Sequence, residues 1–196
     1  MKDKKQKTGK GKEKEIVFVT TNPHKVAEVR GLLKGYTLTN IDLHLPELQG
    51  VQEDIVSAKA SAACLELKKP VVVDDTGLYI TALDGMPGPY GAHFIKAMGV
   101  EKIGKIMSLF QDKTAVFKTC VGYAEPGTKP QVFVGEIAGT MLEKPRGANH
   151  GFGYDPLFVP DGHTRTFAEM TVEEKNRVSH RRKAFLKLVA YLEEKR

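Results

Sequence analysis

The sequence has little cysteine and no long hydrophobic run, and both facts limit where the protein can work. Its 196 residues include two cysteines, Cys64 and Cys120, which lie in apolar surroundings and far apart in the chain. No stretch approaches the ~20 consecutive apolar residues of a membrane-spanning helix, and the N-terminal residues lack the apolar segment of a secretory signal. We therefore expect reduced, buried thiols, a cytoplasmic protein and no membrane association.

The body of the chain also lacks an excess of positive charge, although the whole chain has a formal charge of +6. Residues 1–14 contain seven lysines and two acidic residues, whereas the other 182 residues contain 23 basic and 22 acidic side chains. The basic segment has no hydrophobic residue after Met1, which predicts a disordered tail over 1–14 and a single domain over 15–196. A nearly neutral body predicts no nucleic-acid binding through the folded part.

Internal repeats and low-complexity inserts are absent, and the predicted elements alternate in the manner of an α/β fold. Asn22 and Pro23 suit the N-cap and first position of a helix. The expected strands are 16–20, 36–43, 71–73, 115–124 and 131–142, and the other expected helices are 55–67, 92–97, 101–110 and two that follow Thr171 and Ser179. We expect one extended mixed sheet that serves two lobes, with a cleft between them.

The first candidate site is the segment Thr20–Lys25, where a strand gives way to a helix. Ligands favour this position in α/β sheets because free backbone N–H groups and the helix dipole face an anion there. Lys25 would add a positive charge near a phosphate. The glycines and the Lys-Ser/Thr pair of a Walker A loop are missing, and an ordinary N-capped helix start is the simpler interpretation of this segment alone.

Acidic residues form the second candidate site. Asp74 and Asp75 follow the apolar run 71–73, where we expect a strand to end, and Glu47 lies in a proline-containing loop upstream. Carboxylates gathered at the rim of a sheet suit Mg²⁺, which takes oxygen ligands and bridges to substrate phosphates. The two aspartates could equally cap the turn at Thr76-Gly77.

Two further segments and one lysine are candidates. In Gly151–Pro156, flanking glycines leave Phe152 free to stack on a base, although the ring could instead plug a tight turn. Residues 174–181 gather several hydrogen-bond donors at a break between two helices, which is usually a solvated junction. Lys59 lies on a helix lined with alanines, where a surface lysine is the default interpretation.

Taken together, the order and spacing of these segments resemble the inosine triphosphate pyrophosphatase family. The similarity runs from Ile16 to the last helix, and its strongest parts are Thr20-x-Asn22-x-x-Lys25, Val73-Asp74-Asp75-Thr76, Pro87-Gly88-Pro89-Tyr90, Phe152-Gly153-Tyr154-Asp155-Pro156 and Ser179-His180-Arg181. The resemblance implies an elongated two-lobed α/β fold and a homodimer. It also implies an enzyme that hydrolyses ITP, dITP and XTP to the nucleoside monophosphate and pyrophosphate.

The resemblance further implies a role for each matching residue. The metal ion, Mg²⁺ with Mn²⁺ as an alternative, would be held by Glu47, Asp74 and Asp75. For the mechanism, our own hypothesis is that Asp75 and Lys25 are catalytic, Asp75 by deprotonating the attacking water and Lys25 by sharing the charge of the leaving group. The substrate-binding residues would be Thr20, Asn22 and Lys25 at the triphosphate, Lys59 and Lys175 at phosphate or ribose, and Phe152, Tyr154, Asp155, His180 and Arg181 at the base.

The chain departs from the family pattern at two places, and we assign no role to either. Thr21 stands where relatives usually have glycine, and Gly91-Ala92-His93 lacks the lysine or arginine that follows Tyr90 in relatives, so His93 or Lys96 would have to replace that cation. Two other functions stay open: a related pyrophosphatase for pyrimidine or otherwise modified nucleotides, and a module that binds nucleotides or nucleic acid without catalysis.

Overall fold

The computed structural model describes residues 14–30, 32–33, 36–45, 48–147 and 152–195. Residues 1–13 of the predicted disordered tail lie outside this part of the chain, whereas Lys14 is the first residue of strand β1. In the described part, no helix is both long and apolar enough to cross a membrane.

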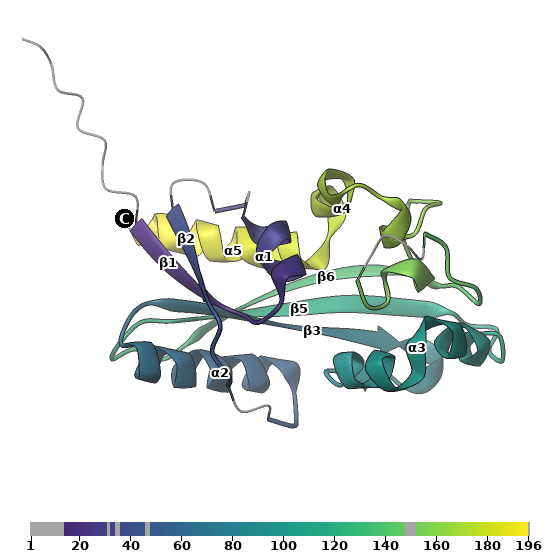
Figure 1. The fold of residues 1–196 in the computed structure, drawn as a ribbon, viewed down its shortest axis with the longest axis horizontal. Helices are drawn as coiled ribbons and strands as arrows, with labels where there is room; N and C mark the ends of the chain where they lie inside the picture. The colour runs from purple at the N-terminus through teal and green to yellow at the C-terminus, as the bar shows by residue number, and fades with distance from the viewer. Residues whose placement is uncertain (1–13, 31, 34–35, 46–47, 148–151, 196) are drawn as a thin grey trace, which may run out of the picture.

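Within the described residues, one mixed sheet of seven strands runs through the molecule (Figure 1). The spatial order is β2-β1-β3-β5-β6-β7, with β4 paired to β3. Strand β1 is parallel to β2 and β3, and all other pairs are antiparallel. The strands are β1 Lys14–Val19, β2 Tyr36–Ile41, β3 Val71–Ile80, β4 Pro87–Gly88, β5 Thr114–Ala124, β6 Gln131–Met141 and β7 Phe158–Pro160. The expected mixed α/β sheet is confirmed.

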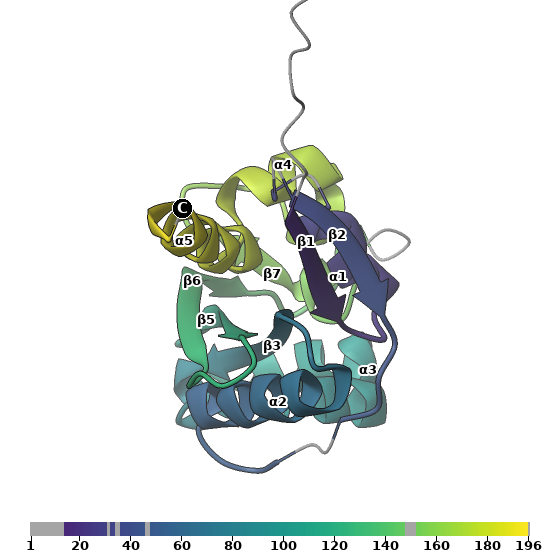
Figure 2. The ribbon, with the colours of Figure 1, turned by 90° about the vertical axis from the view of Figure 1, so that its left-hand side faces the viewer.

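In the part of the chain that the structure describes, five α-helices flank this sheet: α1 Pro23–Val29, α2 Gln52–Leu67, α3 Gly91–Met107, α4 Val172–Val178 and α5 His180–Glu194. Figure 2 shows α2 on one side of the sheet and α1 and α5 on the other. The predicted caps are present, since Asn22 accepts from His24 N, Thr171 forms a capping box with Glu174, and Ser179 accepts from Arg182 N. Helix α2 begins three residues earlier than expected. Its N-cap, Val51, has no capping side chain, so the sequence carries no cap signal for this helix start.

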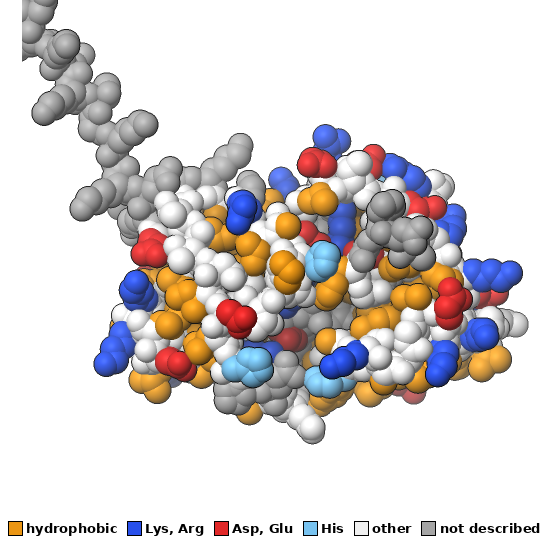
Figure 3. Space-filling model, in the orientation of Figure 1, with side chains coloured by type: hydrophobic (Ala, Val, Ile, Leu, Met, Phe, Trp, Pro, Cys, Tyr) orange, Lys and Arg blue, Asp and Glu red, His pale blue; other side chains and the backbone are white. Residues whose placement is uncertain are grey.

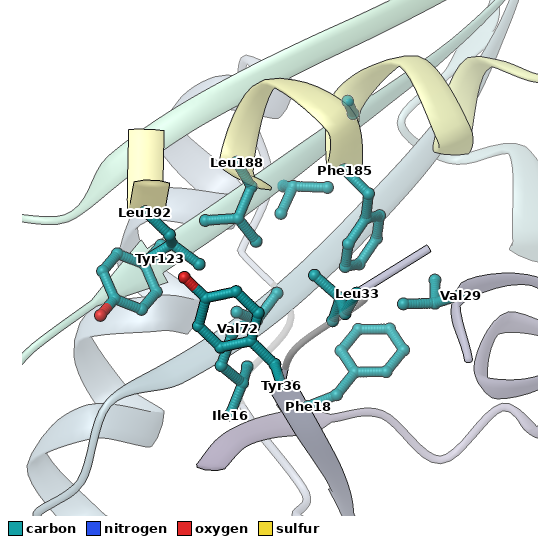
Figure 4. Packing of buried hydrophobic residues seen from close by; sticks show 12 residues of the cluster. Ile16, Phe18, Val29, Leu33, Tyr36, Val72, Tyr123, Phe185, Leu188 and Leu192 are labelled. Atoms are coloured by element: carbon teal, nitrogen blue, oxygen red, sulfur yellow. The ribbon is translucent and has the colours of Figure 1, made fainter. Parts of the chain in front are cut away.

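Buried side chains form three clusters that define the two lobes. At one end, Phe18, Val72 and Phe185 belong to a cluster between β1, β3 and α5 (Figure 4). A second cluster, which includes Val56 and Val73, lies under α2 on the opposite face of the same end. The third cluster is at the far end, where β3 and β5 meet α3, β7 and the loops around them. Burial of these apolar surfaces is the main force that holds each lobe together.

The long strands β3 and β5 connect the lobes, and here the sequence-based prediction was wrong. We expected the strand to end at Asp74-Asp75, but β3 continues to Ile80 and pairs with β5 along its whole length. Its other edge pairs with β1 only at Val71 and Val72 and with β4 only at Leu78 and Tyr79. Within the described residues, the edge from 73 to 77 therefore has no neighbouring strand, and the two aspartates lie in mid-strand beside this gap.

A glycine on β6 lets α5 pack directly on the sheet. A Cβ atom added to Gly135 would lie 2.2 Å from His180 O and 2.4 Å from Ala184 N, so the backbones would have to separate. We expect Gly135→Ala to destabilise the fold by ~1–3 kcal/mol, which lowers Tm by ~2–12 °C in a domain of this size. Thermal unfolding measures this, with Ala138→Ser on the exposed side of the same strand as the control. An unchanged Tm would contradict the close packing.

Candidate active site

A cavity of about 710 Å³ opens beside the unpaired edge of β3. In the space-filling view, basic and acidic side chains lie at the bottom of the hollow between the two ends of the molecule (Figure 3). The predicted site residues that the structure describes all line this cavity: Thr20, Asn22, Lys25, Lys59, Asp74, Asp75, Phe152, Tyr154, Asp155, Lys175, His180 and Arg181. Glu47 lies outside the described residues. The tertiary structure thus brings together residues from five separate segments of the chain.

The loop between β1 and α1 forms one end of the cavity. Asn22 accepts a hydrogen bond from His24 N at 3.0 Å, and Thr20 Oγ1 accepts from Asn22 N at 3.2 Å. Lys25 reaches across the gap to β3, where Nζ donates to Asp74 Oδ1 at 2.8 Å and to the Asp74 carbonyl at 3.2 Å. The segment is therefore an N-capped helix start and, at the same time, part of the cavity wall.

A buried chain of alternating charges connects this loop with the opposite wall. Asp74 pairs with Lys25 through Oδ1 and with Arg181 Nε through Oδ2 at 3.0 Å. Arg181 Nη1 pairs with Glu28, and Glu28 Oε1 lies 2.8 Å from Lys175 Nζ. Lys175 also lies 2.7 Å from Asp155 Oδ2. Three cations and three carboxylates thus neutralise one another in the order Lys25, Asp74, Arg181, Glu28, Lys175, Asp155.

The charged states of this network follow from its partners. Burial alone would raise the pKa of Asp74, but Lys25 and Arg181 outweigh it and hold that pKa below its ordinary value of 3.8. For Glu28, burial is likewise outweighed by Arg181 and Lys175, which lower the pKa from 4.5. Burial and the nearby Arg181 lower the pKa of His180 well below 6.5, so its ring is neutral at physiological pH.

Asp75 points to the other face of the sheet from Asp74. Its Oδ1 lies 3.4 Å from Lys59 Nζ, and its Oδ2 accepts from Gln52 Nε2 at 3.1 Å. The side chain of Asp75 is 17% exposed, whereas that of Asp74 is fully covered. Asp75 is therefore the carboxylate of the pair that a ligand in the cavity can reach.

These contacts decide which aspartate fits a metal ion. Both oxygens of Asp74 are already held by cations, so the expectation that Asp74 binds the metal does not fit this arrangement. Within the described residues, no three His, Cys, Asp or Glu side chains gather into a metal site. Mg²⁺ commonly binds through one or two carboxylates together with substrate phosphates. The partly exposed Asp75 fits such a site.

Aromatic rings form the remaining wall. Phe152 is 43% exposed, and its backbone N–H donates to Asp155 Oδ2 at 3.0 Å. The ring of His24 stacks on Phe152 with centroids 5.2 Å apart. Tyr154 is buried, and its hydroxyl donates to the Gly91 carbonyl at 2.8 Å, so its ring alone faces the cavity. His180 is buried in parallel stacking on Phe117, with centroids 4.8 Å apart.

Sequence reasoning did not identify three residues of this site: Glu28, Gln52 and His24. A signal existed for Glu28, because it follows Lys25 by three residues and so lies on the same face of α1. Gln52 had no such signal, since it reaches Asp75 only through the tertiary packing of α2. Of the two candidates for the cation missing after Tyr90, Lys96 lines the cavity.

The fold and cavity describe a class of protein: a two-lobed α/β protein whose cleft presents paired charges at one end and an exposed aromatic ring near them. Residues 16–191 match the model of the Ham1 family. The dITP/XTP pyrophosphatase of Methanopyrus kandleri is 44% identical over 173 residues, which cover 87% of this chain and 92% of that protein. The inosine triphosphate pyrophosphatase of Schizosaccharomyces pombe is 41% identical and covers 91% of this chain and 95% of its own length.

Solved structures show the same relationship. The Ham1 protein of Staphylococcus aureus has a TM-score of 0.82 at 30% identity, over 93% of this chain and all of that one. A HAM1 protein from Coxiella burnetii has the same TM-score and identity, over 92% of this chain and 99% of its own. The chain belongs to the Ham1 family, and the resemblance inferred from its motifs is confirmed.

Proposed function

We propose that this chain hydrolyses non-standard purine nucleoside triphosphates, namely ITP, dITP and XTP, to the nucleoside monophosphate and pyrophosphate. The observation that carries the proposal is that Lys25, Lys59, Asp75 and the exposed ring of Phe152 line one and the same cavity. Amines suit a polyphosphate, and an aromatic ring suits a stacked base. Two relatives that are 44% and 41% identical to this chain over the aligned residues have names that state the same activity.

The basic residues bind the triphosphate. Lys25 and Lys59 each pair with a carboxylate, at 2.8 Å and 3.4 Å. A phosphate chain brings its own negative charge to these ammonium groups, and they then share the charge that develops on the pyrophosphate leaving group. Catalysis of phosphoryl transfer depends mainly on such positioning and neutralisation.

Asp75 has two tasks in this proposal. It would hold the Mg²⁺ ion, with Glu47 as the expected second ligand, and when bound the ion withdraws charge from the phosphates as the α–β linkage breaks. Asp75 also accepts a hydrogen bond from, and then the proton of, the water that attacks phosphorus.

Selection of the base follows from hydrogen-bond direction. Arg181 has donors only, and three of its five N–H groups are used by Asp74, Glu28 and Thr76. The two that remain suit the 6-oxo acceptor of hypoxanthine or xanthine. Adenine presents a 6-amino donor at that position, so both groups would lack a partner, at ~1–3 kcal/mol each.

Analysis of the products tests the proposal. We expect purified protein with ITP and Mg²⁺ to release IMP and pyrophosphate, which phosphate detection registers only after inorganic pyrophosphatase is added. EDTA should abolish turnover, and Mn²⁺ should restore part of it. Orthophosphate without added pyrophosphatase, or faster turnover of ATP or a pyrimidine triphosphate than of ITP, would contradict the proposal.

We further propose that the protein acts as a homodimer in the cytoplasm. Sedimentation of the purified chain tests the first part, with a mass near twice 21.6 kDa as the expected result. Fractionation of the source cells tests the second.

A further inference from the structure

A buried glutamine lies directly behind Asp75. Gln52 is the first residue of α2 and is 1% exposed. Its Nε2 donates to Asp75 Oδ2 at 3.1 Å and to the Lys118 carbonyl at 3.4 Å, and its Oε1 accepts from the Tyr79 hydroxyl at 3.0 Å. A buried amide is tolerated only when its polar atoms have partners. Gln52 satisfies this condition by contact with Asp75.

The partners of Gln52 permit one orientation of its amide. The carboxylate of Asp75 and the carbonyl of Lys118 only accept hydrogen bonds, so the NH₂ group has to face both. The amide oxygen then faces Tyr79, whose hydroxyl has a proton to donate. Burial raises the pKa of Tyr79 to about 12, so this hydroxyl keeps its proton at physiological pH. The two acceptors thus fix the orientation of the amide, and Tyr79 supplies the hydrogen bond that its oxygen accepts.

The contact distinguishes the two oxygens of Asp75. Oδ2 is held by Gln52, whereas Oδ1 lies beside Lys59, and Lys59 and Asp75 both line the cavity. An amide is neutral, so it holds the carboxylate and leaves its charge in place. A lysine in the position of Gln52 would neutralise that charge. The orientation of a catalytic group matters, since a displacement of 1 Å can lower a rate ~10²-fold.

We propose that Gln52, with Tyr79 behind it, is a positioning residue that holds Asp75 Oδ2 so that Oδ1 faces the reacting groups. This inference rests on the proposed function, in which Asp75 is the catalytic carboxylate. Gln52 itself is buried behind Asp75 and is not one of the residues that line the cavity. Its effect on the reaction passes entirely through Asp75.

The first test is a double-mutant cycle with ITP as the substrate. We expect Gln52→Leu to lower kcat ~10–100-fold with a change in KM of less than ~3-fold, because orientation and not binding is lost. In the Asp75→Asn background, Gln52→Leu should have no further effect. The matched control is Gln131→Leu at the exposed start of β6, which should keep the wild-type kcat. An unchanged kcat in Gln52→Leu, or losses that multiply in the double variant, would overturn the inference.

The second test uses a variant of nearly the same shape and remains informative if Gln52→Leu does not fold. Gln52→Glu puts a second carboxyl group against Asp75, and two adjacent carboxyl groups do not both ionise readily. The acidic limb of the kcat–pH profile should therefore move ~1 unit or more towards higher pH, which a merely structural residue would not cause. Tyr79→Phe should lower kcat in the same direction as Gln52→Leu, but less.

An unmoved acidic limb in a folded Gln52→Glu variant would count against the inference. The catalytic role of Asp75 and the positioning role of Gln52 can be tested separately. If Asp75→Asn keeps its activity, the proposed role of Asp75 fails whatever Gln52 does. If Asp75→Asn is inactive and both Gln52 variants behave as wild type, only the positioning role fails.

Discussion

Asp75→Asn is expected to lower kcat for ITP ~10²–10⁴-fold, the range that a single acid–base group contributes. The substitution keeps the size of the side chain but removes the negative charge that accepts the water proton and attracts a cation. Lys59, 3.4 Å from Oδ1, would lose its ionic partner and remain free to bind phosphate, so substrate binding should persist. Single-turnover kinetics and equilibrium binding of a non-hydrolysable ITP analogue measure the two effects separately.

The matched control for Asp75→Asn is Asp161→Asn, because Asp161 is an exposed aspartate just beyond β7. We expect that variant to keep both kcat and analogue binding. Near wild-type turnover by Asp75→Asn, with the analogue still bound, would show that another group deprotonates the water.

Arg181→Ala is expected to have the largest effect on stability. Arg181 is 4% exposed and pairs with Asp74 and Glu28, so its loss leaves two buried carboxylates with one cation fewer each. Removal of one partner from a buried ion pair typically destabilises by ~3–5 kcal/mol, which lowers Tm by ~6–20 °C in a domain of this size. Urea unfolding and thermal unfolding measure the change, and the exposed Arg177→Ala on α4 is the control. A loss no larger than that of the control would contradict the network.

The same network makes a prediction about pH. Because the folded protein lowers the pKa of Asp74 and Glu28 from 3.8 and 4.5, it binds their protons less readily than the unfolded chain does. Their stabilising contribution is therefore fully present at neutral pH and is lost as the pH falls through the lowered values. The difference in unfolding free energy between the wild type and Arg181→Ala should accordingly shrink as the pH falls below 4.5 and then 3.8, the ordinary pKa values of Glu28 and Asp74.

Arg181→Ala should also lose ITP activity. The remaining preference for ITP over ATP, compared as kcat/KM, should narrow because the donors that favour a 6-oxo group are gone. If the ratio of the kcat/KM values for ITP and ATP did not change, Arg181 would not recognise the base, and its role would be to stabilise the ion-pair network.

The predictions about the stability of Arg181→Ala and its pH dependence concern the buried ion-pair network, which local sequence patterns do not reveal. The sequence indicated a solvated helix junction for residues 174–181, taken alone, yet Lys175, His180 and Arg181 are all buried. The burial of Lys175 and Arg181 is possible because Glu28, Asp74 and Asp155 approach from three other segments. Charge pairing across such separations in the chain has no local signature, so it depends on how the helices pack.

The sequence by itself determined the mixed α/β elements, their helix caps and the family, because apolar periodicity, capping residues and motif spacing are local properties of the chain. The tertiary structure alone decided the tasks of the neighbouring aspartates. Consecutive side chains on a strand point to opposite faces, so Asp74 is buried between Lys25 and Arg181 while Asp75 turns towards Gln52 and Lys59. One face buries its carboxylate between two cations, and the other leaves its carboxylate partly exposed beside an amide and a lysine. This difference depended on the packing of α1, α2 and α5 against a strand that did not end where its apolar run did.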